Sequence, residues 1–208
     1  MLDPDLCYRA LRTRDRRFDG RFFVAVRTTR VFCRPVCPAR TPRPENCLFV
    51  PSAAAAREAG FRPCLRCRPE AAPGTPAWAG TSATVGRALR LIEAGALDDG
   101  DVDGLAARLG MGARHLRRLF AQHLGASPRA VAQTRRVLFA KKLLDETRLS
   151  MVDVAMAAGY ASVRRFNAAV RSAYGRAPRE LRRRGGRAHG ASDRSELTLH
   201  LSYRPPLD

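Results

Sequence analysis

The sequence has almost no lysine: Lys141 and Lys142 are the only two, so nearly all of its positive charge is arginine. It has no hydrophobic signal segment at its start, which argues against an oxidising compartment. It also has no apolar run that approaches the roughly 20 residues needed to span a membrane. These absences predict a cytoplasmic protein without a membrane partner.

The charge that is present is strongly one-sided. The 38 basic residues outnumber the 19 acidic ones, and the formal net charge is +19. The planar guanidinium of arginine suits phosphates and the edge of guanine, although a GC-rich genome would also enrich arginine. A hydrophobic content of 45% argues against a disordered basic tail. The favoured partner is therefore nucleic acid.

Four cysteines have the spacing of a metal site. Cys33 and Cys37 follow the pattern Cys-x3-Cys, and Cys64 and Cys67 follow Cys-x2-Cys. Two tight turns of this kind can direct four sulfurs at one ion, and Zn²⁺ prefers four thiolates in a tetrahedron. We therefore expect zinc as the cofactor. Two disulfides, or four separate thiols, are the alternatives.

Residues 1–72 are expected to form a small α/β domain around these cysteines. Residues 21–26 and 46–50 have the β-branched and aromatic character of strands. Ser52 is expected to cap a short helix over residues 53–59. Because the domain contains little apolar material, zinc is expected to supply much of its folding free energy.

A linker rich in proline and glycine is expected at residues 73–81, and a helical domain at 82–184. The helical domain repeats at an offset of 50 residues, as Arg114 and Arg164 illustrate. Each copy has the pattern of a short helix, a tight turn and a longer basic helix, which is a helix-turn-helix. The chain as a whole is therefore predicted to be α+β: a small zinc-stabilised α/β domain followed by an all-α domain.

The longer helices are expected at residues 113–124 and 163–174, joined by a helix over 128–146. The joining helix would span just under ~30 Å, so two recognition helices on one monomer could enter successive major-groove faces, which lie about 34 Å apart. One face of each longer helix is apolar and must meet the core. An ordinary solvated surface is the alternative for the opposite face. The residues predicted to face DNA are Arg114, His115, Arg117, Arg118, Arg164, Arg165, Asn167 and Arg171.

The cysteine-containing stretches resemble the bacterial Ada family. Residues 28–40 (TTRVFCRPVCPAR) and 59–70 (AGFRPCLRCRPE) are similar to its N-terminal zinc domain. Residues 82–184 look like the AraC-type pair of helix-turn-helix units that follows in that family. The end of the chain, 197–208, is similar to the start of an AlkA-type DNA glycosylase domain. The resemblance makes residues 185–208 a linker and the start of a truncated glycosylase domain, in the front part of an Ada–AlkA fusion protein.

The resemblance implies DNA repair combined with regulation. The family removes the methyl group from methylphosphotriesters in DNA and transfers it irreversibly, in a single turnover, to a zinc-bound cysteine. By this resemblance Cys33, Cys37, Cys64 and Cys67 bind the zinc, and Cys33 accepts the methyl group. The implied partners are double-stranded DNA and RNA polymerase, and the implied result is activation of transcription. The alternatives are a non-catalytic, zinc-stabilised regulator and the regulatory front of a glycosylase whose catalytic part follows Asp208.

The chemistry of these residues agrees with that implication. Four thiolates on one Zn²⁺ leave two net negative charges, and zinc keeps the sulfurs deprotonated at neutral pH. Methylation would turn one thiolate into a neutral thioether, which lowers the repulsion between the cluster and DNA phosphates. Affinity for DNA is therefore expected to rise after methylation.

Residues beside the cysteines are expected to contact DNA, and Arg34, Arg40, Arg43 and Arg66 among them are also expected to stabilise the phosphodiester anion that leaves. The residues expected to contact DNA are Thr29, Arg30, Arg34, Arg40, Arg43 and Arg66. Arg30 departs from the family, which usually has glycine there, so it either alters the backbone or adds a phosphate contact. The sequence contains no Pro-Cys-His-Arg motif for alkylguanine repair, so methyl transfer from guanine is not expected.

Overall fold

The structure is a computed structural model, which describes residues 3–72 and 83–182. The described chain has a sheet of four strands followed by a helical part, so the predicted α+β class is confirmed. Within these residues no helix is both long and apolar enough to cross a membrane. The expected linker at 73–81 and the expected glycosylase start at 185–208 lie outside the described residues.

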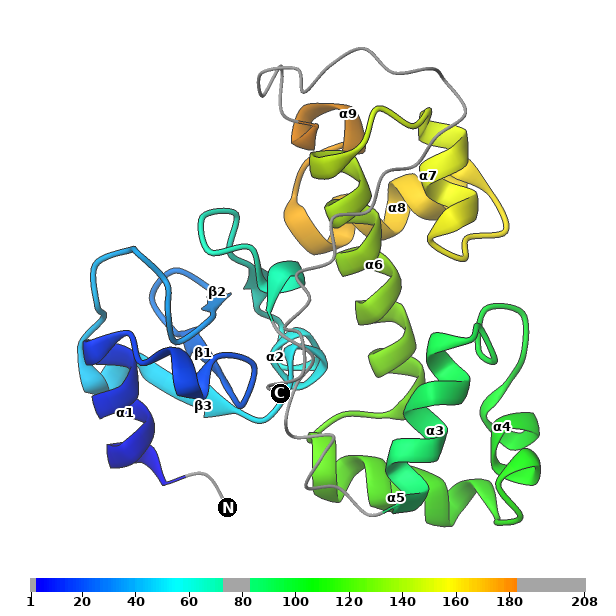
Figure 1. Cartoon of the computed structure of the whole chain (residues 1–208), viewed down its shortest axis with the longest axis horizontal. Helices are drawn as coiled ribbons and strands as arrows, with labels where there is room; N and C mark the ends of the chain where they lie inside the picture. The colour runs from blue at the N-terminus through cyan, green and yellow to red at the C-terminus, as the bar shows by residue number, and fades with distance from the viewer. Residues whose placement is uncertain (1–2, 73–82, 183–208) are drawn as a thin grey trace, which may run out of the picture.

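The secondary-structure elements fall into two groups along the chain (Figure 1). Residues 3–72 contain α1 (Pro4–Thr13), η1 (Arg16–Phe18), β1 (Phe23–Val26), β2 (Val31–Cys33), η2 (Pro44–Asn46), β3 (Cys47–Val50), α2 (Ala53–Glu58), β4 (Arg62–Pro63) and η3 (Pro69–Ala71), where η marks a 3-10 helix. Residues 83–182 contain α3 (Ala83–Glu93), α4 (Val102–Arg108), α5 (Ala113–Leu124), α6 (Pro128–Glu146), α7 (Met151–Ala157), α8 (Val163–Tyr174) and α9 (Pro178–Leu181).

The sheet brings two distant cysteines to one edge. Its strand order is β3-β1-β2-β4, with β1 antiparallel to β2 and β3, and with β4 parallel to β2. The parallel pair aligns Phe32 with Pro63, and the N–H of Cys64 donates to the carbonyl of Phe32 over 3.0 Å. Cys33, the last residue of β2, therefore lies beside Cys64, which follows β4. Neither of these two strands was predicted from the sequence.

The two faces of the sheet are covered by different helices. Successive residues of a strand point to opposite faces, so Phe23 and Val24 of β1 enter different apolar clusters. Helix α1 packs on the Val24 face through Cys7 and Leu11. Helix α2, whose four alanines are buried, packs on the face of Phe23 and Phe32. The sheet thus has an apolar core on each face.

The helical part consists of two helix-turn-helix units, and α5, α6 and α8 have the predicted boundaries. Ser127 and Ser162 cap α6 and α8, because their hydroxyls accept the N–H of the third residue of each helix. Gly125 and Gly175 end α5 and α8 in the left-handed conformation, with φ of 64° and 68°. These local signals explain why the helix boundaries could be predicted from the sequence.

Helix α6 contributes to the cores of both units (Figure 1). Ala132, near its start, joins the cluster of α3, α4 and α5 that buries Leu116 and Phe120. Its later residues, such as Val137, pack with α7, α8 and α9 around Phe166. The two units are therefore fixed to opposite ends of one helix.

The sheet-containing part packs directly on this helix through α2. The hydroxyl of Ser52 donates to the carbonyl of Leu124 over 2.7 Å, and the carboxylate of Glu58 accepts the N–H and the hydroxyl of Ser127. Leu138 of α6 packs against the apolar cluster under the sheet. The small core that the sequence predicts for the first part is therefore completed by the second part.

Buried charges form a second contact between the two parts. Arg68, which follows the last cysteine of the cluster, lies 3.1 Å from Asp145 and from Glu146 of α6. Lys141 of α6 pairs with Asp145 and lies 3.8 Å from Glu70. The side chains of Glu70 and Asp145 are only 2% and 1% exposed. We call these five residues the interdomain ion network.

Candidate metal centre and DNA interface

The predicted cysteines converge on one point at the β2–β4 edge. The four Sγ atoms of Cys33, Cys37, Cys64 and Cys67 lie within 4.8 Å of one another, and none is in a disulfide. A tetrahedral Zn²⁺ with Zn–S bonds of about 2.3 Å separates its sulfurs by about 3.8 Å. The cluster therefore has the size of a four-thiolate zinc site, and soft sulfur donors do not suit magnesium or calcium.

The four thiols of the cluster affect one another's protonation. Hydrogen bonding with Cys37, Cys64 and Cys67, together with burial, raises the pKa of Cys33. Hydrogen bonding from Cys33 and from the other two thiols lowers the pKa of Cys64. The thiols therefore interact strongly, and a cation among them would favour the thiolate form of all four.

The four sulfurs are not equivalent. Hydrogen bonds from Cys33 and from the backbone N–H of Ala39 are among the causes that lower the pKa of Cys37 to about 7, and the backbone N–H of Cys67 adds to the thiols that act on Cys64. Cys37 and Cys67 are buried, whereas Cys33 and Cys64 are half-buried. The influences on the pKa of Cys33 are the other thiols and burial. A hydrogen bond that a sulfur accepts draws electron density away from it, so the four sulfurs differ in electron density.

Arg34 ties the two cysteine turns together. Its backbone N–H donates to Sγ of Cys67 over 3.3 Å, and its Nη1 donates to the carbonyl of Cys67 over 3.2 Å. Its Nε and Nη2 both donate to the carboxylate of Asp19, which is buried beside it. Arg34 was predicted to face DNA; the structure places its side chain in this buried ion pair. Asp19 was not predicted, because no local pattern connects it with a residue that follows 15 positions later.

Arg30 shows why glycine suits its position. It lies in the left-handed region with φ of 54°, which L residues rarely adopt. Its guanidinium lies 4.7 Å from the ring centre of Phe61, and a Cβ at Gly60 would come within 2.9 Å of its Nη2. The carbonyl of Arg30 still accepts the N–H of Arg62. Arg30 is therefore compatible with the backbone pairing of β2 and β4, and its guanidinium lies over an aromatic ring. Thr29, in the same turn, is exposed.

The other predicted cations beside the cysteines are exposed. Arg40, Arg43 and Arg66 are all exposed, and they lie in the loops that carry the cysteines or follow them. The loop with Arg40 is held by α1, because the hydroxyl of Tyr8 donates to the carbonyl of Pro42 over 3.1 Å. Helix α1 thus helps to position exposed arginines that are available to a phosphate.

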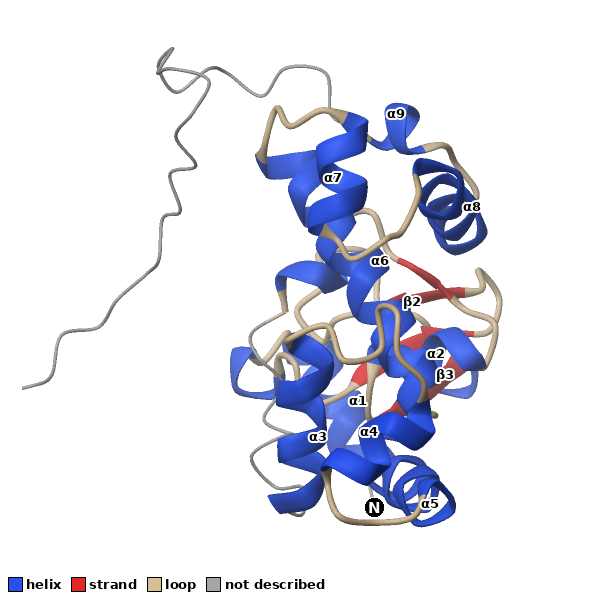
Figure 2. Ribbon diagram, turned by 90° about the vertical axis from the view of Figure 1, so that its right-hand side faces the viewer, coloured by secondary structure: helices blue, strands red, loops and turns tan. Residues whose placement is uncertain are grey.

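The predicted DNA-facing residues of the helical part are all exposed. Helices α5 and α8 lie near opposite ends of α6, and on the same side of it in Figure 2. The 19 residues of α6 span about 28 Å, close to the roughly 34 Å between successive major-groove faces. The exposed residues are Arg114, His115, Arg117 and Arg118 on α5, and Arg164, Arg165, Asn167 and Arg171 on α8.

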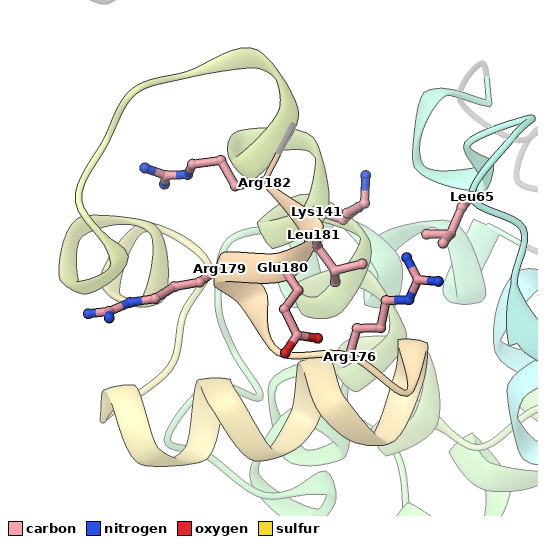
Figure 3. Close-up of a pocket in the computed structure, with 7 residues that line it drawn as sticks. All are labelled: Leu65, Lys141, Arg176, Arg179, Glu180, Leu181 and Arg182. Carbon is pink, nitrogen blue, oxygen red and sulfur yellow. The ribbon is translucent and has the colours of Figure 1, made fainter. Parts of the chain in front are cut away.

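A groove lies between the second cysteine turn and the segment that follows α8 (Figure 3). Its volume is about 720 Å³, and its lining includes Leu65 of the cysteine turn and Lys141 of α6. Arg176 points towards Leu65, whereas Arg179 and Arg182 point away from it. The sequence did not predict this basic groove, because it depends on how the two parts pack.

Comparisons with known proteins agree with this geometry. A family model described as "Metal binding domain of Ada" matches residues 6–70, and one described as "Helix-turn-helix domain" matches residues 105–184. A protein of Mycobacterium tuberculosis, named "Probable bifunctional transcriptional activator/DNA repair enzyme AlkA", is 47% identical over 99% of this chain. The match covers 42% of that relative, so the chain spans less than half of its length. The predicted zinc cofactor is confirmed by the metal-binding match together with the cysteine cluster.

Solved structures match both parts. A crystal structure of "the methylated N-ADA/DNA complex" is 37% identical, with 64% of this chain and 96% of that chain covered and a TM-score of 0.34. The C-terminal domain of AraT, a response regulator from Geobacillus stearothermophilus, is 26% identical, with 56% of this chain and 98% of that chain covered and a TM-score of 0.50. The second likeness supports the fold of the helical part.

Proposed function

This chain belongs to the Ada family, and on that basis we propose that it repairs methylated DNA and activates transcription in response. Cys33 removes the methyl group from a methylphosphotriester in double-stranded DNA, once and irreversibly, and the methylated chain then binds promoter DNA more tightly. The proposal includes the division into a methyl-acceptor domain at 1–72 and a DNA-binding domain at 82–184. The observation that carries it is the cluster of four free sulfurs, of which those of Cys33 and Cys64 belong to half-buried residues.

The reaction moves one methyl group from oxygen to sulfur. When bound, zinc holds the sulfurs as thiolates at neutral pH. Sγ of Cys33 attacks the methyl carbon in line with its C–O bond; the S–C bond forms as the C–O bond breaks, and the electron pair leaves on the phosphate oxygen. No proton moves, because the nucleophile is a thiolate and the leaving group is a phosphodiester anion. The thioether has no easy route back, which limits the chain to one turnover.

The contacts of the cluster support Cys33 as the acceptor. Its neighbour Cys67 accepts a backbone N–H and is buried. Cys37 is buried as well, and it receives a backbone N–H in addition to its contact with Cys33. A sulfur that is half-buried rather than buried can reach a methyl group on a DNA backbone outside the protein. Cys64 is half-buried too, but it accepts the backbone N–H of Cys67. Cys33 is therefore the half-buried sulfur that best combines access with electron density.

Exposed arginines support binding to the DNA backbone. Arg40, Arg43 and Arg66 surround the cluster without a partner that neutralises them among the described residues. Each can contact a phosphate and stabilise the diester anion as it leaves. Two basic helices at opposite ends of α6 support promoter recognition by a monomer. Activation also requires a contact with RNA polymerase, which we include in the proposal.

Methylation changes the charge that faces DNA. Four thiolates with Zn²⁺ carry two net negative charges, and methylation of one sulfur removes one of them. Repulsion between the cluster and nearby phosphates then falls, so affinity rises without a new contact.

The proposal is tested by methyl transfer to cysteine variants. Zinc-loaded protein is mixed with DNA that carries methylphosphotriesters, and the added mass is mapped to peptides. Wild-type protein is expected to gain one methyl group on the peptide with Cys33, and Cys33→Ala to gain none while its helical part still binds DNA. Cys47→Ala, at a cysteine outside the cluster, is the matched control and is expected to react normally. Zinc-loaded wild-type protein that gains no methyl group would instead be a non-catalytic regulator.

A further inference from the structure

Beside the cluster lies a buried ion pair that takes no direct part in the bond changes of methyl transfer. The carboxylate of Asp19 accepts hydrogen bonds from Nε and Nη2 of Arg34, the residue that follows Cys33. The two side chains are only 7% and 15% exposed. A buried carboxylate is costly unless it is paired, so its place beside the cluster calls for an explanation.

We propose that Asp19 sets the charge of the cluster's surroundings, and so holds the unmethylated chain in its weakly binding state. The inference rests on the proposed function. Without Asp19, Arg34 would place one uncompensated positive charge next to the thiolates. The local charge would then fall from two negative charges to one, which is the value that methylation of Cys33 produces. Asp19 therefore keeps the local charge of the unmethylated state different from that of the methylated state.

The hydrogen bonds also fix where the guanidinium points. Two of its nitrogens are held by Asp19, and Nη1 donates to the carbonyl of Cys67 rather than to a sulfur. The guanidinium is thereby kept from donating to the thiolates, which would lower their nucleophilicity. Asp19 is thus a positioning residue for the transfer as well as a charge-setting residue for DNA binding.

The chain offers a matched control in Asp15. Its carboxylate also pairs with an arginine, Arg17, but the Arg17 side chain is 85% exposed, and within the described residues the pair has no hydrogen bond or ion pair with the cysteine cluster. Asp15→Asn and Asp19→Asn make the same change in net charge within the same part of the chain. A difference in DNA affinity between the two variants therefore depends on where the charge lies and not on the net charge of the chain.

The test measures the dissociation constant of zinc-loaded, unmethylated protein for one duplex without methylphosphotriesters, at one salt concentration. One unit charge about 5 Å from a phosphate in water changes an affinity roughly fourfold. Asp19→Asn is therefore expected to bind DNA roughly fourfold more tightly than Asp15→Asn. It should also approach the affinity of methylated wild-type protein. Equal affinities of the two variants, with one zinc bound to each, would overturn the proposal.

The double variant Asp19→Asn/Arg34→Gln removes both charges of the pair, so it has no buried unpaired charge. It distinguishes an effect of the local charge from an effect of the lost hydrogen bonds. It is expected to return to wild-type affinity, whereas a merely structural clamp predicts no recovery. If Asp19→Asn does not retain zinc, the affinity of this double variant decides: a value far from wild type contradicts the proposal. Methylation of wild-type Cys33, followed by mass spectrometry, is scored separately, so failure of the proposed function and failure of this inference are distinguishable.

Discussion

Replacement of Lys141 by methionine is expected to destabilise the protein strongly, because Lys141 lies inside the interdomain ion network. Its side chain is 5% exposed and pairs with Asp145, and it lies 3.8 Å from Glu70. Oε2 of Glu70 and Oδ1 of Asp145 already have no hydrogen-bond partner within the described residues. Loss of the ammonium would leave two buried carboxylates with Arg68 as their remaining cation.

Breaking a buried ion pair by removing one partner costs about 3–5 kcal/mol. For a protein of this size, 1 kcal/mol shifts the melting temperature by about 2–4 °C, so the expected drop is roughly 6–20 °C. The assay is thermal unfolding of zinc-loaded protein, followed by circular dichroism at neutral pH. Because the network joins the two parts, the variant is also expected to melt less cooperatively.

Lys142 provides the matched control, since it is the next residue of α6 and is exposed. Lys142→Met removes the same charge from the same helix and is expected to change stability by less than about 0.5 kcal/mol. If Lys141→Met melts within a degree or two of Lys142→Met, the ion network does not stabilise the contact between the two parts, and this reasoning is refuted.

Three further predictions follow from the same contacts. Arg30→Gly is expected to stay within about 1 kcal/mol of wild type in urea unfolding, because loss of the contact with Phe61 is offset by relief of the left-handed backbone; Arg30→Val should cost about 1–2 kcal/mol, and equal stability of the two variants contradicts this. Removal of zinc with a chelator is expected to expose the amide of Cys64 to hydrogen exchange while α6 stays protected, and unchanged protection of Cys64 would count against a metal that holds the β2–β4 edge. Burial raises the pKa of Glu70 above its ordinary value of 4.5, so the folded state binds this proton more tightly than the unfolded state. The stability of wild type relative to Glu70→Gln should therefore decrease as pH rises from 4.5 towards neutral, and an increase in denaturant titrations would contradict the sign.

The helical part could be predicted almost residue by residue, because its signals are local. Serine caps at Ser127 and Ser162, glycines that end α5 and α8, and apolar spacing along each helix all act within a few residues. The repeat duplicates the glycine that ends each longer helix, because Gly125 and Gly175 lie 50 positions apart. For the same reason the exposed faces of α5 and α8 were predicted correctly, whereas contact of these faces with DNA stays a prediction.

The cysteine site was predicted from its spacing, but the strands that build it were not. β2 and β4 contain three and two residues, too few for an alternation of apolar and polar side chains to be recognised. Their parallel pairing joins residues about 30 positions apart in the chain, which no local pattern encodes. The same limit applies to the pair of Asp19 with Arg34. The choice of Cys33 as acceptor also stays a prediction.

The packing between the two parts could not be predicted for a related reason. The sequence suggests a small first domain with little apolar material, whereas the cluster under its sheet is completed by residues of α6. Ser52 illustrates the limit: the sequence predicts it as the cap of α2, and the structure shows that its hydroxyl also bonds the carbonyl of Leu124. Local chemistry predicts the first contact but cannot indicate a partner in another domain.

The central claim is that one sulfur couples repair to DNA binding, and the most direct test is the affinity of one protein sample before and after methylation. Zinc-loaded protein is titrated with a fixed promoter duplex at one salt concentration, methylated with methylphosphotriester DNA until mass spectrometry shows one methyl group on the Cys33 peptide, purified and titrated again. Tighter binding is expected after methylation, with zinc still bound. Equal affinity before and after methylation would contradict the proposed coupling.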